Sequence, residues 1–345
     1  MIGARLTTLL FSFLVILSAC ETETTRKNST ESKKSSLSEV FTPINTFTTQ
    51  PTEETTLFSV SDIYSYDNRL YISDISGDKI VVFDTTGHLL YKWGKTGKGP
   101  GEFQSPNAIS IGPDGQVYVG DSDNNRVQIF TPSGTYLRQF DTNVTQIFDI
   151  LVTDINNKKR VYIIGRRSCG SEQCAIHTYD KKGEIIRSFG SLMDQNTYIY
   201  TWVSGWGPNK TILLSHIHTP KIRIFSLRGE HLKTVDISTP NWIGLYDGEQ
   251  SLSVRSAFDL LNSKKHTRIR SISHTNDKYV VQLFPSNFDN ERENLLSLYS
   301  LDGTLTHHSM KTENVMVKDE PLTLYEYLPE GNGAITIERY AYEGQ

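Results

Sequence analysis

The chain has 345 residues, with 35 basic and 39 acidic side chains, a formal net charge of −4 and no long block of either sign. A nucleic-acid-binding protein normally carries a basic stripe, so this composition excludes a nucleic-acid partner. After the first twenty residues, no apolar run approaches the roughly 20 residues that a membrane-spanning helix needs.

The first residues have the layout of an export signal. Arg5 supplies a positive charge, Leu9 to Leu17 (LLFSFLVIL) form a short apolar run, and Ser18 and Ala19 lead into Cys20. The ending LSAC resembles a bacterial lipobox, which predicts a signal peptide over residues 1–19 and a lipid (palmitate) on Cys20. The alternative is an ordinary secretory signal followed by a chance cysteine.

The segment after the signal has the composition of a tether. Residues 21–36 contain no apolar side chain, so they have nothing to bury that would offset the cost of ordering them. We therefore expect a disordered tether over residues 20–39 and an exported, lipid-anchored protein. Glu21 rather than aspartate follows the cysteine, which favours the outer membrane, with the domain facing the periplasm or the cell exterior.

A repeat dominates the remainder, residues 40–345. An aromatic residue followed four positions later by glycine occurs five times: Phe83/Gly87, Phe130/Gly134, Tyr179/Gly183, Phe225/Gly229 and Tyr299/Gly303. The glycines are 47, 49, 46 and 74 residues apart, so one unit carries an insertion, which we place near residues 238–265. A fixed period of this length is typical of repeat architectures.

Each unit contains short alternating strands separated by turns. In the second unit the strands are Ile109–Ile111, Val117–Val119, Val127–Phe130 and Tyr136–Phe140. Four short antiparallel strands in each unit are the pattern of β-propeller blades. The alternative, a pair of sheets packed as a sandwich, does not demand a fixed period.

The second unit also resembles a known repeat. Residues 97–134 (GKGPGEFQSPNAISIGPDGQVYVGDSDNNRVQIFTPSG) are similar to an NHL repeat. The matching positions are Gly99, Gly101, Phe103, Pro106, Pro113, Asp114, Gly115, Tyr118, Val119, Asp121, Asn124, Arg126, Val127 and Phe130. The resemblance implies an all-β, six-bladed propeller of NHL/TolB-like type.

Five blades are visible between residues 57 and 312, which leaves the sixth short of strands. The last 33 residues supply Leu322–Tyr327 and Ile335–Tyr342, too few for a blade. We expect Val40–Thr48 to pair with this blade, because that closes the ring and removes an open sheet edge.

Cys169 and Cys174 are the other two cysteines. In an exported chain, two cysteines this close predict a disulfide that closes a short loop. A metal site would need further ligands nearby, and the local sequence has none. We therefore expect neither a metal nor a cofactor.

Two histidines, His216 and His218, are two residues apart and are expected on one face of a strand. The repeat places His216 where earlier units have Asp74 and Asp121. Such residues form a polar ring at one mouth of the channel, or they stabilise the loops around them. The second interpretation is favoured, because aspartates that hold turns are abundant.

Six further residues are candidates for ligand binding at a channel mouth. They fall in or beside the innermost strands or the loops after the second strands: Asn107, Asp149, Arg166, Arg167, Trp202 and Trp206. Exposed aromatic and arginine side chains suit a sugar or peptide. The alternative for both tryptophans is packing between blades.

The sequence thus predicts a monomeric, lipid-anchored binding or scaffold module without catalysis, which presents one face to a protein, peptide or glycan. The alternative is a metal-dependent hydrolase or lyase, lactonase-like, acting at the channel mouth. Zinc-dependent lyases and calcium-dependent lactonases share the architecture, but the fold alone does not carry their chemistry.

Overall fold

The computed structural model describes residues 37–50, 52, 55–169, 172–191, 202–237, 242, 267–284, 294–312, 314–318, 323–329 and 334–342. The predicted signal peptide, Cys20, residues 20–36 of the tether and all of the 238–265 insertion except Trp242 lie outside these residues. Leu37–Glu39, which we placed in the tether, form a short 3-10 helix, η1. In the described part of the chain, no helix is long and apolar enough to cross a membrane.

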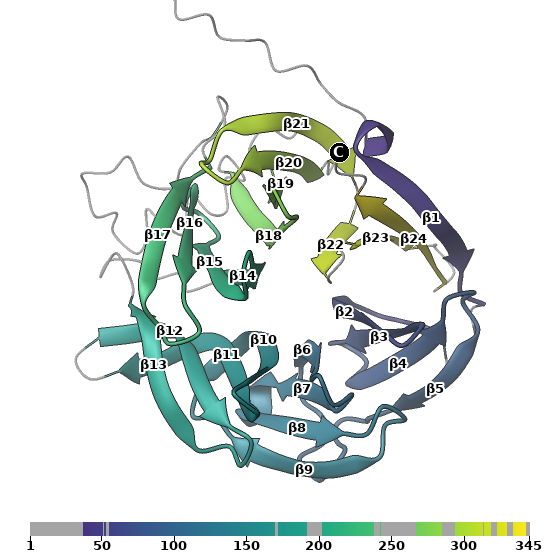
Figure 1. The fold of residues 1–345 in the computed structure, drawn as a ribbon. Coiled ribbons are helices and arrows are strands. Elements are labelled where there is room, and N and C mark those ends of the chain that lie inside the picture. Colours follow the sequence, from purple (N-terminus) through teal and green to yellow (C-terminus); the bar gives the residue numbers. More distant parts are fainter. Residues whose placement is uncertain are drawn as a thin grey trace, which may run out of the picture. The chain divides into compact units, whose positions relative to one another are not determined.

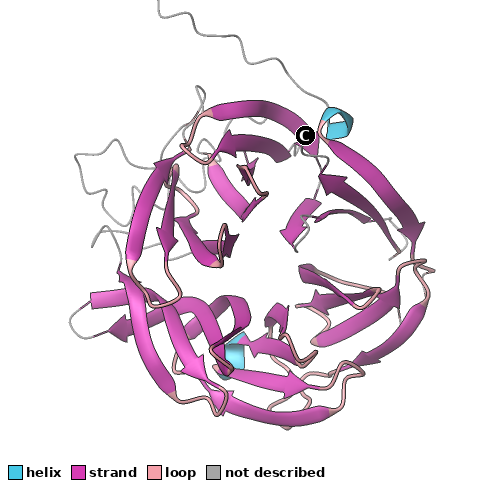
Figure 2. Ribbon diagram, viewed as in Figure 1, coloured by secondary structure: helices cyan, strands magenta, loops and turns pink. Residues whose placement is uncertain are grey.

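The expected six-bladed β-propeller is confirmed. Six four-stranded antiparallel sheets follow one another around a ring, in chain order from purple to yellow in Figure 1. Figure 2 shows that almost every regular element is a strand, the exceptions being η1 and the 3-10 helix η2 (Ser122–Asn124).

The strands of the first three blades, from the channel outward, are as follows. Blade one contains β2 (Val60–Tyr66), β3 (Arg69–Asp74), β4 (Lys79–Asp84) and β5 (Leu89–Trp93); blade two contains β6 (Pro106–Ile111), β7 (Val117–Asp121), β8 (Arg126–Phe130) and β9 (Tyr136–Asp141); blade three contains β10 (Thr145–Ile155), β11 (Lys158–Cys169), β12 (Glu172–Asp180) and β13 (Ile185–Ser191).

The remaining blades follow the same order. Blade four contains β14 (Trp202–Gly207), β15 (Thr211–His216), β16 (Lys221–Phe225) and β17 (His231–Asp236); blade five contains β18 (Arg268–His274), β19 (Lys278–Phe284), β20 (Asn294–Ser300) and β21 (Leu305–Thr312); blade six contains β22 (Asn314–Lys318), β23 (Thr323–Pro329), β24 (Ile335–Tyr342) and β1 (Phe41–Thr48). The sequence analysis missed β22, the innermost strand of blade six.

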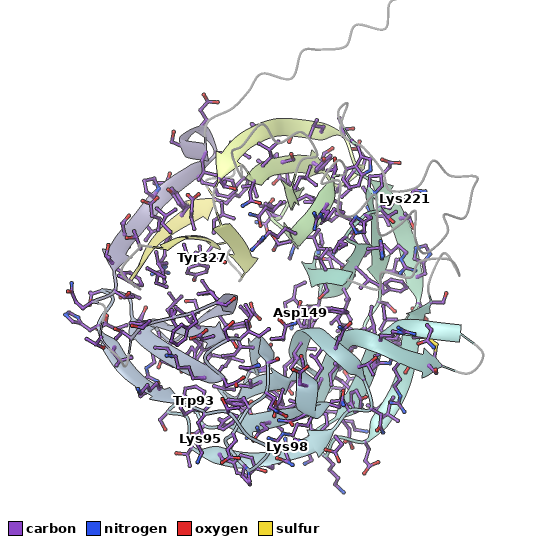
Figure 3. All side chains as sticks on the ribbon, turned by 180° about the vertical axis from the view of Figure 1, so that it is seen from behind. Trp93, Lys95, Lys98, Asp149, Lys221 and Tyr327 are labelled. Carbon is purple, nitrogen blue, oxygen red and sulfur yellow. A yellow bond between two sulfur atoms is a disulfide. The ribbon has the colours of Figure 1, made fainter. Side chains whose placement is uncertain are left out.

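The hydrophobic core lies between the blades rather than within them. Each of six clusters of buried apolar side chains joins one pair of neighbouring blades. This follows from strand geometry, because alternate side chains of a blade face the two neighbouring blades. Figure 3 shows side chains filling these spaces, with Trp93 far from the channel and Asp149 close to it.

The repeated glycine has two physical reasons. Gly87 and Gly134 adopt φ of +89° and +86° in the turn between the third and fourth strands, a conformation that costs glycine little. An added Cβ would also lie 2.5 Å from Phe47 and 2.6 Å from Trp93, each on the fourth strand of the preceding blade. The turn glycine therefore lets an aromatic ring of one blade lie directly against the backbone of the next.

The N-terminal strand closes the ring as predicted. β1 pairs antiparallel with β24, from Phe41 opposite Tyr342 to Thr48 opposite Thr336. The register shifts between Pro43 and Asn45, so Ile44 is an extra residue in a β-bulge. Phe41 and Phe47 are six residues apart and would otherwise share a face. With the bulge, Phe41 packs among residues of blade five and Phe47 among residues of blade one.

Deleting Ile44 tests this closure. Without the bulge, one of the two buried phenylalanines turns away from its cluster, so we expect the free energy of unfolding to fall by about 3–5 kcal/mol, the cost of losing one buried aromatic side chain. Ile44→Ala is the matched control; the side chain is 51% exposed, and its truncation should cost under about 0.5 kcal/mol. Urea unfolding followed by circular dichroism measures both variants. Equal stability of the two variants would show that the bulge does not set the faces of β1.

One buried histidine makes the stability of the fold depend on pH. His177 on β12 is fully buried, with Nδ1 2.8 Å from the Ser188 hydroxyl and Nε2 3.2 Å from the Gly165 carbonyl oxygen. The carbonyl only accepts, so Nε2 carries the proton and donates it. Burial lowers the pKa of His177 from 6.5 to about 4, so the ring is neutral in the folded protein at neutral pH.

We expect the free energy of unfolding to fall as the pH falls from 6.5 to about 4. In this window the unfolded chain binds a proton at His177 that the folded chain does not bind, and the stability lost is about 3 kcal/mol. In His177→Gln this part of the pH dependence should disappear, as measured by urea unfolding across the window. An unchanged pH slope in the variant would mean that His177 is not kept neutral by the fold.

Candidate functional site

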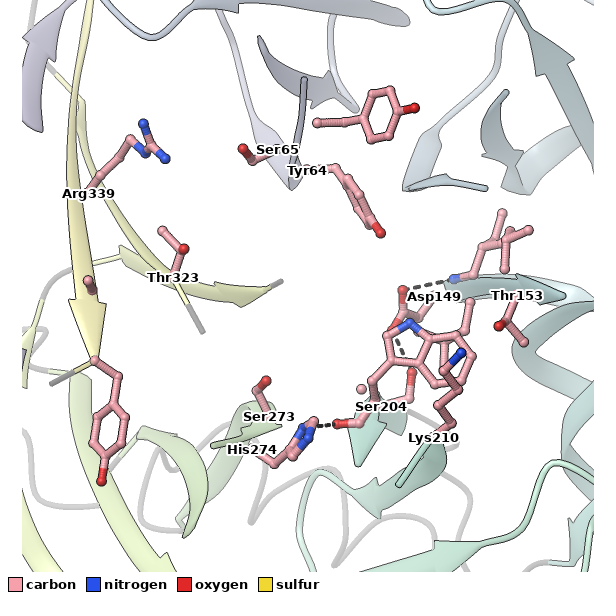
Figure 4. A pocket seen from close by; sticks show the side chains of 18 of the residues that line it. Tyr64, Ser65, Asp149, Thr153, Ser204, Lys210, Ser273, His274, Thr323 and Arg339 are labelled. Carbon is pink, nitrogen blue, oxygen red and sulfur yellow. Dashed lines mark hydrogen bonds between the residues drawn. The ribbon is translucent and has the colours of Figure 1, made fainter. Parts of the chain in front are cut away.

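The channel has two different ends, and one of them holds a cavity. We call the end where the first and second strands of each blade join the hairpin face, and the end where successive blades join the linker face. A cavity of about 720 Å³ lies at the hairpin face and is lined by residues of blades one, three, four, five and six. Figure 4 shows its walls, among them Tyr64, Asp149, Lys210, His274 and Arg339.

Tight turns form part of the rim of this cavity. The two central residues of the turn have positive φ in Asp67–Asn68 of blade one and in Asn209–Lys210 of blade four. This is the two-residue hairpin turn whose twist matches that of the strands, and it explains the asparagines. The turns bring Asn68 and Lys210 to the cavity.

Asp149, predicted as a binding residue, lines the cavity but is already bonded. Its carboxylate accepts the backbone N–H of Ile150 at 2.8 Å and the hydroxyl of Ser204 at 2.5 Å. Ser204 lies on β14 of the next blade, so Asp149 ties two innermost strands together. Asp62 of blade one does the same, since it accepts the backbone N–H of Ile109 on β6 at 2.9 Å.

Trp206 lines the cavity and also packs between blades. Its ring meets that of Tyr162 edge-on at 6.4 Å, and its carbonyl oxygen lies 2.9 Å from Nδ1 of His274 on β18. The side chain is partly exposed. Packing between blades is therefore present, and part of the side chain also faces the cavity; its role in binding stays a prediction.

The other predicted binding residues lie toward the linker face, away from the cavity. Asn107 donates from its amide to the Ile147 carbonyl oxygen at 2.8 Å and thereby joins blades two and three. Arg166 is exposed, and Arg167 donates to the Tyr179 hydroxyl at 3.3 Å. Trp202 begins β14, and its side chain lies outside the described part of the structure. The sequence analysis thus assigned residues of two different faces to one site.

His216 and His218 are close together, but they do not share a strand face as predicted. His216 ends β15, whereas His218 lies in the turn after it. The two rings are buried, with centroids 5.6 Å apart, and the His218 backbone N–H donates to His216 Nδ1 at 3.3 Å. Among the described residues, no group of three His, Cys, Asp or Glu side chains is placed to hold a metal ion.

The aspartates at the corresponding position in blades one and two stabilise loops. Asp121 is fully buried and accepts the Gln104 backbone N–H at 2.7 Å and the Arg126 Nε–H at 2.6 Å. Asp74 accepts the backbone N–H groups of Ser59 at 2.9 Å and Gly77 at 3.1 Å. The polar ring considered at the channel mouth is therefore, in these two blades, a set of loop anchors.

The predicted disulfide is present. Cys169 and Cys174 are bonded between β11 and β12, the second and third strands of blade three. The bond closes the hairpin at its tip, on the linker face.

Two cations of the cavity, Arg339 and Lys210, were not predicted. Arg339 lies on the third strand of blade six, where the repeat pattern is lost and β22 went unrecognised. The sequence could have indicated Lys210, because the Asn-Lys pair between two strand patterns predicts a tight turn whose side chains project at the channel mouth.

The fold and its blades match a known family. Residues 19–202 match the DUF5128 family, which is described as a six-bladed β-propeller. The chain belongs to this family.

Solved structures of the same architecture are distant in sequence. A protein described as exported, from Bacteroides fragilis, has a TM-score of 0.68 and 10% identity, over 91% of this chain and 98% of its own. A DUF4221 family member from Bacteroides vulgatus has a TM-score of 0.60 and 10% identity, over 88% and 98%. A catalytically inactive virginiamycin B lyase from Staphylococcus aureus, crystallised with quinupristin, has a TM-score of 0.53 and 14% identity, over 85% and 82%. At these identities the similarity shows the fold alone.

A curated relative matches only part of the chain. The protein brain tumor of Drosophila melanogaster is 24% identical over 125 residues, which are 36% of this chain and 11% of that protein. The chain therefore spans about a tenth of the length of this relative.

Proposed function

We propose that this propeller is a non-catalytic binding module, which takes up part of a protein, peptide or glycan in the cavity at its hairpin face. The cavity itself is the observation that carries the proposal. Its volume of about 720 Å³ lies in the usual range for ligand sites, and it combines aromatic walls with a few polar groups. Trp206 and Tyr64 supply aromatic surface, the kind of side chain that dominates binding energy at interfaces.

The family and the fold do not themselves supply an activity. The structural similarity to virginiamycin B lyase shows a shared architecture alone. We also interpret blade two as an NHL-type repeat, supported by the Asp121–Arg126 pair at its loop.

A pair of variants tests which face binds. An array of oligosaccharides and peptides probed with the detergent-solubilised full chain identifies a ligand, and the affinity of the variants for it is then measured. Trp206→Ala should weaken binding at least about tenfold, or about 1.4 kcal/mol, because its ring lines the cavity. Arg166→Ala, an exposed residue toward the linker face, should leave the affinity unchanged. The reverse outcome would move the site to the linker face and refute the proposal.

We further propose that the module is exported and held at a bacterial membrane, favouring the outer membrane, by a lipid on Cys20. The LSAC ending and the polar residues 21–36 support this. Cys20→Ala should release the chain from the membrane fraction, because the acyl chains on Cys20 are the proposed anchor. Fractionation and the intact mass of the mature protein measure this. An unchanged membrane fraction, together with a mass that lacks acyl chains, would contradict lipid anchoring.

A further inference from the structure

Two carboxylates that line the cavity already have partners, whereas two of its cations have no carboxylate near them among the described residues. Asp149 is bonded to Ser204 and to backbone, and Asp67 lies 3.9 Å from Arg69 at the rim. In the part of the chain that the structure describes, no carboxylate lies within ion-pair distance of Arg339 or Lys210. The cavity thus presents two cations while its own anions are engaged.

Arg339 is held in place, but its Nε lacks an acceptor among the described residues. Its guanidinium carbon lies 5.8 Å from the ring centroid of Tyr325, its register partner on β23, which is fully buried. Its Nε is buried and has no hydrogen-bond partner among the described residues. Burying a donor without an acceptor costs free energy, and a charged donor costs more than a neutral one. An anionic oxygen at the guanidinium of Arg339 would give this cation a partner that the described residues do not supply.

The other walls indicate what carries the anionic oxygen. Trp206 and Tyr64 offer aromatic faces, and hydroxyls of Ser204, Ser273 and Thr323 surround the space. Sugar rings have apolar faces that stack on aromatic rings and hydroxyls that match such polar groups. In Figure 4, Arg339 and Lys210 lie on opposite walls, which suits an extended ligand with more than one negative charge.

We propose that the cavity binds an acidic oligosaccharide of the uronate class, with a carboxylate paired to the Arg339 guanidinium and a second one near Lys210. This inference rests on the proposed function, because it names the ligand class of the same cavity. A carboxylate suits Arg339, since the planar guanidinium binds it through two parallel hydrogen bonds.

Calorimetric titration of the detergent-solubilised full chain with tetragalacturonate and with the neutral tetrasaccharide cellotetraose tests the proposal. The acidic sugar should bind, and the neutral one should bind at least about tenfold more weakly. Arg339→Gln should weaken binding of the acidic sugar at least about tenfold. The melting temperature should change little, because losing the contact with Tyr325 is offset by removing the unpartnered Nε donor. Arg339→Lys keeps the charge but cannot form two parallel hydrogen bonds, so its affinity for the acidic sugar should fall between those of the wild-type chain and Arg339→Gln.

Two further variants sharpen the result. Lys210→Asn keeps a residue that tolerates the positive φ of this turn and should weaken binding of the acidic sugar but not of the neutral one. Arg228→Gln, an exposed cation in the turn between β16 and β17, is not among the residues of the cavity and should change nothing.

The outcomes separate this inference from the proposed function. Equal binding of both sugars, weakened by Trp206→Ala but not by Arg339→Gln, would overturn the acidic preference and keep the cavity as the site. An effect of Arg228→Gln as large as that of Arg339→Gln would reduce the binding to general electrostatic attraction and overturn the inference. The inference is also overturned if tetragalacturonate does not bind. It is overturned as well if an acidic peptide binds at least about tenfold more tightly and displaces tetragalacturonate from Arg339.

Discussion

The structure depends on one contact that recurs around the ring, the contact between a turn glycine and a side chain of the preceding blade. An added Cβ at Gly87, Gly134, Gly183 and Gly229 would meet Phe47, Trp93, Phe140 and Phe189 respectively. Each of these aromatic residues lies on the fourth strand of the blade before. The six buried clusters also lie between blades. The contact between glycine and ring therefore helps to fix the distance between the two neighbouring blades that share it. The channel and the cavity take their width from that spacing.

The chain must use its N-terminus to complete this pattern. Gly87 of blade one meets Phe47, which comes from β1, so without β1 this glycine would have no ring to pack on. The bulge at Ile44 lets the same strand fill the spaces on both sides of blade six. The next residue, Asn45, is opposite Arg339 in the register of β24, and both Ile44 and Arg339 line the cavity. The bulge that lets β1 close the ring therefore lies beside Arg339, the cation of the proposed site. Bulges are common next to functional sites.

Most of the architecture could be predicted from the sequence, because a fixed spacing of aromatic and glycine residues has one physical cause. The spacing located the strands of blades one to five, and counting strands then identified β1 as the missing partner. β22 was missed because its sequence, Asn314–Lys318, is short and has neither the aromatic nor the glycine of the repeat. The insertion around residues 238–265 stays a prediction.

The site was predicted only in part, for a reason that lies in the geometry of propellers. Position in a repeat tells which strand a residue occupies, and this placed Asp149 and Trp206 near the channel. It does not tell which end of the channel a side chain faces, so Arg166 and His216 were grouped with them although they lie toward the other end. Nor does it show which polar groups are already bonded, and Asp149 and Asn107 both prove to join neighbouring blades. Arg339 depends on the register between β1 and β24, which are almost three hundred residues apart in the chain.

The central claim is that β1 is an integral strand of the ring, and that the cavity depends on it. Hydrogen–deuterium exchange of the full chain measures this most directly, because backbone amides in a closed ring exchange only when the ring opens. The account predicts that peptides covering Phe41–Thr48 are protected as strongly as those covering Ile335–Tyr342, their partners in β24. Rapid exchange of the β1 amides beside slow exchange of β24 would contradict closure by this strand, and with it the origin of the cavity wall.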